Sequence, residues 1–213
     1  FFSLIAILFF SPIFLIITLI LLSTGENEVF FVQKRVGRNG KIFKLLKFCT
    51  MLKNSPFMGS KTITVKNDPR ILPFGKLLRK TKINELPQLL NILKGDMSLI
   101  GPRPLSVETY NLYSDEIKNL IVKIRPGLSG LGSIFFRSEE EILTIEDLKT
   151  EYFFCLIEYK GELEKWYYHN QSLKNYFLLI ILTILIVIFP SKVDLKKVFK
   201  NLPTPSKKIS NLF

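Results

Sequence analysis

The sequence is poor in the residues that build metal clusters and disulfide frameworks. Its 213 residues include one histidine, His169, and two cysteines, Cys49 and Cys155. The cysteines lie far apart, neither belongs to a CxxC pair, and no histidine lies close enough to suggest a zinc site. We therefore expect two reduced thiols, as in a cytosolic compartment, and we assign no role to His169.

Charge is missing from the first 22 residues, whereas the whole chain carries a formal net charge of +12. The mean hydropathy is nevertheless positive, at +0.25. An apolar block beside basic segments indicates a membrane surface, because anionic headgroups attract Lys and Arg at about 1 kcal/mol each. Nucleic acid would explain the positive charge but not the apolar block. We therefore expect anionic membrane lipids as partners and no nucleic acid.

A cleavage site of the signal-peptide kind is also missing. The apolar run, residues 1–24, exceeds the usual hydrophobic region of a signal peptide, and no small-x-small site follows it. The run is long enough to span a bilayer, for which about 20 apolar residues suffice. Because the chain begins with Phe1 rather than Met, we expect it to be a fragment that lacks a few N-terminal residues.

Ser11 and Pro12 stand at the midpoint of this run. Proline removes a backbone donor and clashes with the carbonyl four residues back, so it kinks or breaks a helix. Ser11 could donate a hydrogen bond to a freed carbonyl, which makes a break tolerable in lipid. The residues alone allow a spanning helix or a sharply bent helix that enters and leaves by one face, and they favour the spanning helix.

Residues 25–170 mix short apolar runs with turn signals, without an internal repeat or a low-complexity linker. A hairpin is predicted from a strand at Val29–Val32, a turn at Arg38–Gly40 and a return strand at Ile42–Phe48. The remaining patterns are helical, so we expect an α+β fold that is mostly helical.

Four further segments of this domain have a helical pattern. Basic and apolar residues alternate at helical spacing in Pro73–Lys80, and leucines recur from Leu86 to Leu93, with Gly95 at the expected C-terminal cap. Ser114–Val122 and Glu139–Tyr159 are predicted as two more helices.

A third region, residues 171–213, follows this domain. Tyr176–Phe189 is apolar for 14 residues, which is short for a span, Pro190 ends it, and a lysine-rich tail follows. We expect an amphipathic helix at the membrane interface with its lysines facing headgroups. A second spanning helix is the alternative.

Asn84 and Glu85 precede the leucine-rich helix, where a helix start favours an anion. Three cations precede them: Arg79, Lys80 and Lys82. Together these residues would suit a diphosphate, with Glu85 as a magnesium ligand. The structural alternative is also reasonable, because Asn is a good N-cap and Glu is favourable in a first turn.

Three arginines lie beside prolines: Arg70, Arg103 and Arg125. Proline restricts the backbone on both sides of itself, so such an arginine can present its planar fork to a phosphate at low entropic cost. The alternative for each is a rigid surface turn.

These segments resemble a known family. The string DPRILPFGKLLRKTKINELPQLLNILKGDMSLIGPRPL is similar to the central signature of the bacterial sugar transferases, the monotopic phosphoglycosyl transferases. FFVQKRVGRNGKIFKLLKFCTM upstream, IRPGLSGLGSI downstream and the Ser11-Pro12 pair extend the resemblance over nearly the whole chain, from Phe1 to about Ile184.

The resemblance implies an enzyme of the bacterial inner membrane. Its members transfer a phospho-sugar from a UDP-sugar to polyprenol phosphate, usually undecaprenyl phosphate, at the cytoplasmic face, with Mg²⁺ as cofactor and UMP as leaving group. This reaction would be the first step of a surface glycan or glycoconjugate pathway. The mechanism proposed for the family is covalent, with a carboxylate from an Asp-Glu dyad as nucleophile. The N-terminal helix would be re-entrant, with both ends cytoplasmic, and a homo-oligomer is left open.

The family's functional positions carry over as follows. Glu85 matches the second member of the dyad, and Arg79 matches the arginine just before the dyad. Arg103 matches the arginine of a Pro-Arg-Pro element, Arg125 that of Arg-Pro-Gly, and Lys47 the lysine of a Lys-Phe-Arg-x-Met element.

Two positions depart from the family pattern. Asn84 stands where the nucleophilic Asp is usual, and Cys49 stands where the family usually has arginine. Glu85 could act as the nucleophile instead, or the phospho-sugar could pass directly to the lipid phosphate. The alternative to both is an inactive member that binds nucleotide sugar or lipid phosphate, or that acts as an assembly partner. A basic membrane scaffold without a small-molecule site is a weaker alternative, because it would not need this set of residues.

Overall fold

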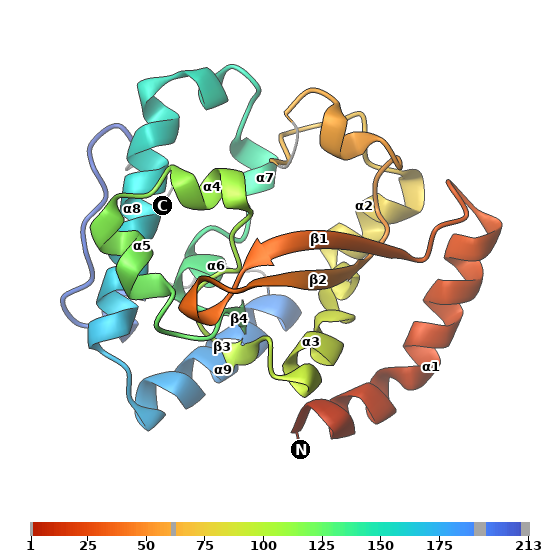
Figure 1. The fold of residues 1–213 in the computed structure, drawn as a ribbon, viewed down its shortest axis with the longest axis horizontal. Coiled ribbons are helices and arrows are strands. Elements are labelled where there is room, and N and C mark those ends of the chain that lie inside the picture. The colour runs from red at the N-terminus through yellow and green to blue at the C-terminus, as the bar shows by residue number, and fades with distance from the viewer. Residues whose placement is uncertain (1, 61–62, 190–194, 210–213) are drawn as a thin grey trace.

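The computed structural model describes residues 2–60, 63–189 and 195–209 (Figure 1). The first half contains α1 (Phe2–Ser23), β1 (Phe30–Val36), β2 (Ile42–Phe48), α2 (Pro73–Lys80), α3 (Gln88–Lys94) and β3 (Ser98–Ile100). The second half contains α4 (Val107–Asn111), α5 (Asp115–Ile121), β4 (Gly127–Ser129), α6 (Leu131–Phe135), α7 (Glu139–Ile142), α8 (Glu151–His169), α9 (Leu173–Ile188) and α10 (Leu195–Val198). The predicted α+β class with mostly helical content is confirmed.

The helix α1 is continuous through Pro12, and its ribbon changes direction along its length (Figure 1). Pro12 has no N–H for the carbonyl of Leu8, four residues back. The Ser11 hydroxyl donates to that carbonyl at 2.7 Å, as the sequence predicts. The helix therefore tolerates its proline without leaving the Leu8 carbonyl unpaired.

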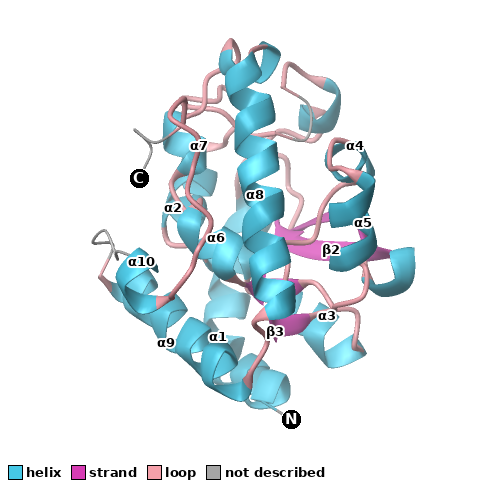
Figure 2. Ribbon diagram, turned by 90° about the vertical axis from the view of Figure 1, so that its left-hand side faces the viewer, coloured by secondary structure: helices cyan, strands magenta, loops and turns pink. Residues whose placement is uncertain are grey.

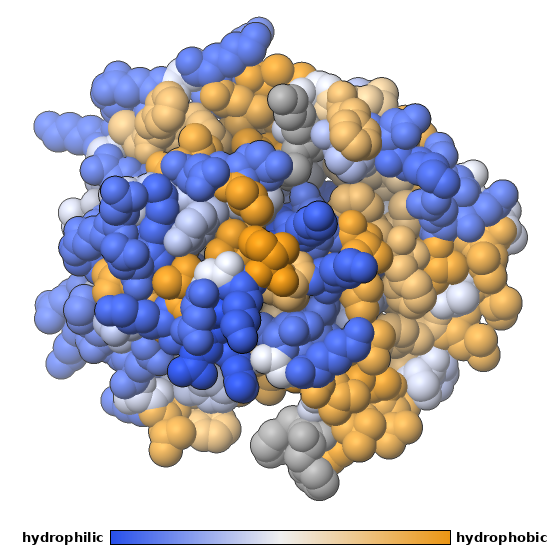
Figure 3. Space-filling model, in the orientation of Figure 1, coloured by the Kyte–Doolittle hydropathy of each residue, from blue (hydrophilic) through white to orange (hydrophobic). Residues whose placement is uncertain are grey.

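One face of α1 packs on the domain and the rest is open. Ile17 and Leu21 are buried against Phe48 of β2 and Leu78 of α2. Burying one such aliphatic side chain stabilises the fold by about 1.5–3 kcal/mol. Along the described residues, Ser3–Ser23 is the helix long and apolar enough to cross a membrane. Figure 3 shows hydrophobic residues gathered on the side where α1 lies. This surface indicates association with a membrane.

The predicted hairpin is present, and its first strand is longer than expected. β1 and β2 pair antiparallel from Phe30 with Phe48 to Val36 with Ile42. Asn39 and Gly40 have φ of 58° and 72°, a conformation that Asn and Gly adopt readily. β1 continues through polar residues to Val36 because the backbone ladder does not depend on apolar side chains.

The helix predicted at Pro73–Lys80 is confirmed as α2, and Gly95 ends α3 with φ of 85°. The expected N-cap at Asn84 is wrong. Lys82 has a left-handed φ of 59°, after which residues Ile83–Glu85 form a 3₁₀ turn and α3 begins only at Gln88. Backbone bonds within this turn satisfy donors that a capping side chain would otherwise take, so Asn84 caps nothing.

The predicted helix at Ser114–Val122 is confirmed as α5, whereas Glu139–Tyr159 is divided. Asp147 accepts hydrogen bonds from the backbone N–H and the hydroxyl of Thr144, at 2.8 and 2.6 Å. Such local side-chain bonds compete with a helix. α7 therefore stops at Ile142, and α8 starts at Glu151 and continues to His169.

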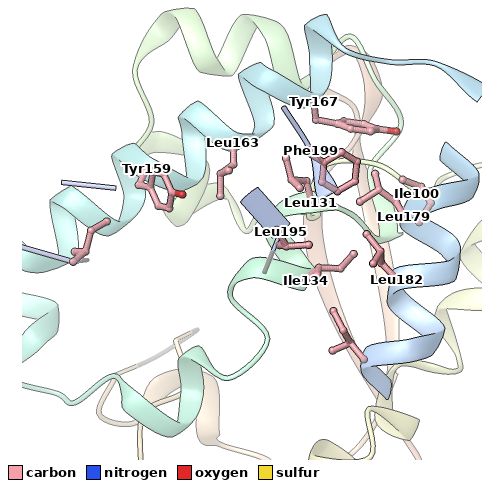
Figure 4. Packing of buried hydrophobic residues seen from close by; sticks show 12 residues of the cluster. Ile100, Leu131, Ile134, Tyr159, Leu163, Tyr167, Leu179, Leu182, Leu195 and Phe199 are labelled. Carbon is pink, nitrogen blue, oxygen red and sulfur yellow. The ribbon is translucent and has the colours of Figure 1, made fainter. Parts of the chain in front are cut away.

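The main core lies between α6, α8 and α9. Tyr159, Leu163 and Tyr167 of α8 face Leu131 and Ile134 of α6 and the buried leucines of α9 (Figure 4). α8 runs as one long helix through the domain (Figure 2). The predicted apolar helix at Tyr176–Phe189 is present as α9, which begins at Leu173; Pro190 lies outside the described residues.

Candidate functional site

A cavity of about 570 Å³ lies between the hairpin, α1 and the α6–α9 half of the domain. Its walls combine charged side chains from the hairpin and the 3₁₀ turn with apolar ones from α1 and α9. Phe10 and Ile13 of α1 and Ile186 and Val187 of α9 supply the apolar part. The cavity therefore joins a charged interior to the helices that expose apolar surface.

Glu85 is the central carboxylate of the charged wall. Its Oε1 lies 2.9 Å from Nζ of Lys47 and 3.8 Å from Nη2 of Arg103, and all three residues line the cavity. The sequence prediction that these three residues share one site is thus consistent with the geometry.

Burial and charge act in opposite directions on these groups. Burial raises the pKa of Glu85, but the neighbouring charges of Lys47 and Arg103 outweigh it and bring the pKa down to about 2. Burial lowers the pKa of Lys47 to about 8, because desolvation outweighs the attraction of Glu85. Glu85 is therefore ionised at neutral pH, and Lys47 loses its proton at a pH just above neutrality.

The loop that carries Arg103 is held from two sides. The backbone N–H of Val36 donates to the carbonyl of Leu105 at 2.9 Å, which ties the loop to the end of β1. The N–H of Gly127 donates to the carbonyl of Pro102 at 2.8 Å, which ties it to the parallel pair β3–β4. Arg103 is thereby fixed at the cavity by contacts far away in sequence.

Arg35 is a cation that the sequence analysis missed. It lines the cavity, and its Nη1 donates to the carbonyl of Pro104 at 3.2 Å. Burial and the nearby Arg103 lower its pKa to about 10. The alternation of side chains along a strand could have revealed it, because Phe31, Gln33 and Arg35 lie on the same face of β1. Lys47 of β2, the cross-strand partner of Phe31, lies on that face of the hairpin too.

Arg79 lines the same cavity but has an anionic partner. Glu140 of α7 forms ion pairs with Arg79 and with Lys82, the latter at 3.4 Å. Arg79 also donates to the hydroxyl of Thr64 at 2.7 Å. An anionic substrate at Arg79 would have to compete with Glu140, a residue that the sequence analysis did not single out.

Four residues of the predicted diphosphate and catalytic site do not line the cavity, and the first of them, Lys80, is exposed. Arg70 is buried, and its guanidinium binds Asp68, the Ser60 hydroxyl and the backbone carbonyls of Ser55, Met58 and Ile63. Arg125 is exposed, and Asn84 is buried with no hydrogen-bond partner for its Oδ1. Cys49 does line the cavity, and burial raises the pKa of its thiol.

The donor set tests the expected magnesium ion. Among the described residues, no group of three or more His, Cys, Asp and Glu side chains could hold a metal. Glu85 also has cations as neighbours. Mg²⁺ is commonly held by one or two carboxylates together with substrate phosphates. A Mg²⁺ ion at Glu85 would therefore need most of its ligands from a bound diphosphate and water.

Comparisons with known proteins show which proteins this chain resembles. The exopolysaccharide production protein ExoY of Rhizobium meliloti is 36% identical over 162 residues, which cover 70% of this chain and 71% of ExoY. The undecaprenyl-phosphate galactose phosphotransferase of Salmonella typhimurium is 34% identical over 170 residues, or 73% of this chain and 32% of its own length. The UDP-glucose:undecaprenyl-phosphate glucose-1-phosphate transferase of Klebsiella pneumoniae is 39% identical over 155 residues, or 70% of this chain and 32% of its own length.

The chain thus matches most of ExoY but only about a third of the length of the other two relatives. A family model described as "Bacterial sugar transferase" matches residues 1–190, which is well over half of the chain. The chain belongs to the bacterial sugar transferase family.

Proposed function

We propose that this chain transfers a sugar phosphate from a UDP-sugar to undecaprenyl phosphate and releases UMP, as the first step of a surface glycan pathway. The observation that carries the proposal is the cluster of Glu85, Lys47 and Arg103 in a cavity that also borders α1. The names of the Salmonella and Klebsiella relatives describe the same class of reaction.

The charged wall suits a diphosphate. Lys47, Arg35 and Arg103 offer three cations, which would bind the phosphates and stabilise charge that develops on the transferring phosphoryl group. Glu85 is ionised and lines the cavity, whereas Asn84 does not. We assign Glu85 the nucleophilic role: it would attack the sugar-bearing phosphate and expel UMP, and the lipid phosphate would then accept the phospho-sugar.

Magnesium belongs to this proposal as a cofactor. Glu85 would hold it together with the diphosphate, and the bound ion would neutralise charge on the phosphate oxygens.

The lipid acceptor would approach along the apolar part of the cavity. Phe10 and Ile13 of α1 lie on the cavity wall, so a polyprenol chain at the membrane could place its phosphate near Glu85. We infer a monotopic enzyme on the cytoplasmic face of the inner membrane, with α1 re-entrant. The Ser11–Leu8 hydrogen bond supports a bend at Pro12.

The reaction is tested with purified protein in detergent micelles, Mg²⁺, a panel of UDP-sugars and undecaprenyl phosphate. We expect UMP release that needs the donor and Mg²⁺. Release of one equivalent of UMP without the lipid would support the covalent route through Glu85, whereas strict dependence on the lipid would indicate direct transfer. No release for any sugar would favour the inactive alternative, to which the activities named for the relatives give no support.

Asn84→Asp tests the departure from the family pattern. A higher rate of UMP release would mean that the amide limits the reaction. An unchanged rate would mean that Asn84 does not face the substrate, which is the result that its buried position outside the cavity wall favours. The melting temperature of the variant checks that a new buried carboxylate has not unfolded it.

The topology of α1 is tested with single cysteines placed before Phe2 and after Ser23, in a variant that lacks Cys49 and Cys155. We expect a membrane-impermeant thiol reagent to label both positions from the cytoplasmic side only. Labelling of one end from the outside would indicate a spanning helix instead.

A further inference from the structure

The cavity contains polar atoms that nothing in the described chain satisfies. Five buried side-chain atoms of the described residues have no hydrogen-bond partner, and four belong to cavity-lining residues: Arg35 Nε, Arg79 Nε, Ser133 Oγ and Glu164 Oε2. Buried polar groups in folded proteins are nearly always paired. Their gathering at one cavity therefore indicates a ligand that completes them.

Among these four atoms, Oε2 of Glu164 is the carboxyl oxygen that lacks a hydrogen-bond partner. Glu164 lies on α8, is 7% exposed, and its Oε2 has no partner while the backbone N–H of Arg103 donates to its carboxylate. Burial raises its pKa to about 8. The group is largely shielded from solvent, and apolar core residues, among them Leu163 and Tyr167, adjoin it on α8.

Gly132 of α6 leaves space for the Glu164 carboxyl group because glycine has no side chain. A Cβ on Gly132 of α6 would lie 2.6 Å from Oε1 of Glu164. Gly132 and Ser133, whose Oγ is unpaired, both line the cavity beside α8. The α6–α8 end of the cavity therefore presents a carboxyl and a hydroxyl at one place.

Arg103 contacts both this end of the cavity and the end where Glu85 and Lys47 lie. Its backbone N–H binds Glu164, and its guanidinium lies 3.8 Å from Glu85. One residue thus contacts both carboxyl groups, Glu164 through its backbone and Glu85 through its side chain, and both carboxyl groups belong to residues that line the cavity.

We propose that Glu164 binds a hydroxyl group of the nucleotide sugar while the phosphates lie at Lys47, Glu85 and Arg103. This inference rests on the proposed function and adds a residue that recognises the donor. The hydroxyl groups of the sugar and of the ribose can both donate and accept hydrogen bonds, so they can pair with Oε2 of Glu164 whether or not the carboxyl group is protonated. Undecaprenyl phosphate has no carbon-bound hydroxyl, so Glu164 would act on the donor and not on the lipid.

A binding role makes a different prediction from a structural one. Glu164→Gln keeps the size of the side chain and an acceptor for the N–H of Arg103, so a binding role predicts weaker binding of the UDP-sugar with little change in melting temperature. A glutamate kept for stability alone would lower the melting temperature without changing binding of the UDP-sugar.

The test compares Glu164→Met and Glu164→Gln with Glu158→Gln, a control at an exposed position of α8 outside the cavity. KM for the preferred UDP-sugar and inhibition by UMP are measured in the UMP-release assay, and binding is measured by calorimetry. We expect Glu164→Met to raise KM by about 10- to 100-fold, with a smaller change in kcat, and Glu164→Gln to recover part of the loss. Glu158→Gln should stay within twofold.

A second variant moves the carboxyl group without removing it. Gly132→Ala should displace Glu164 and raise KM in the same direction. If binding of the UDP-sugar weakens while inhibition by UMP is unchanged, Glu164 binds the transferred sugar. If binding of UMP weakens to the same extent, Glu164 binds the ribose.

An unchanged KM in both Glu164→Met and Gly132→Ala, with wild-type turnover, would overturn this inference and leave the proposed function intact. A wild-type protein that neither binds nor turns over any UDP-sugar would overturn both.

Discussion

Arg70 and Arg103 each lie beside a proline and each face a carboxylate, yet their surroundings differ. Arg70 donates to both oxygens of Asp68, to three backbone carbonyls and to the Ser60 hydroxyl, and its side chain is 4% exposed. Arg103 is 54% exposed, and its guanidinium lies 3.8 Å from Glu85 at the cavity wall.

The difference separates a structural arginine from one that can bind substrate. The donors of Arg70 are occupied by Asp68 and by oxygen atoms of Ser55, Met58, Ser60 and Ile63, so a phosphate would have to displace these partners. Arg103 has capacity left for a ligand. Four predictions test this contrast, from the largest expected effect to the smallest.

Glu85→Gln should lower kcat/KM for UMP release by at least about 10³-fold, because the variant loses the charged group at the centre of the cavity. The amide keeps the size of the side chain, so the fold should survive. Initial rates with the preferred UDP-sugar measure the effect, and circular dichroism checks folding. A decrease in kcat/KM of less than tenfold would mean that Glu85 is not the nucleophile.

Arg70→Ala should destabilise the protein by about 3–5 kcal/mol, because it leaves the buried carboxylate of Asp68 without its partner. The hydrogen bonds of Arg70 hold the pKa of Asp68 below its ordinary value even though burial opposes this. Denaturant unfolding in micelles measures the loss. The fraction that remains folded should keep its KM; a KM change as large as that of Arg103→Ala would contradict the structural role.

Arg103→Ala should lower kcat/KM by about 10²-fold, since one phosphate-binding cation is lost from the cavity. Arg125→Ala is the matched control, because Arg125 also adjoins a proline but lies exposed outside the cavity wall. We expect less than a twofold change for Arg125→Ala. Equal losses in the two variants would mean that the arginines act together.

The pH profile should reveal Lys47. Its pKa is lowered to about 8 by burial, so it carries the charge that would bind phosphate below that pH and loses this charge above it. We expect kcat/KM, which reports the free enzyme, to fall about tenfold per pH unit above pH 8. In Lys47→Arg the fall should disappear from this range, because arginine keeps its charge. An identical profile would assign the fall to another group.

Much of the local structure could be predicted from the residues alone. The apolar run of α1, the hairpin at Arg38–Gly40, the helix Pro73–Lys80 and the cap at Gly95 follow from side-chain spacing and from the dihedral preferences of Asn, Gly and Pro. The family motifs also singled out Glu85, Lys47 and Arg103, which the structure brings together at the cavity wall.

The tertiary structure decided which polar residues face the cavity. Pro-Arg elements look alike in sequence, but long-range packing buries Arg70, exposes Arg125 and leaves Arg103 on the cavity wall. Arg35 and Glu164 come into the site only because β1 and α8 are brought together around it. Sequence patterns set local conformation within a few residues, whereas the burial and partners of a charge depend on segments far along the chain.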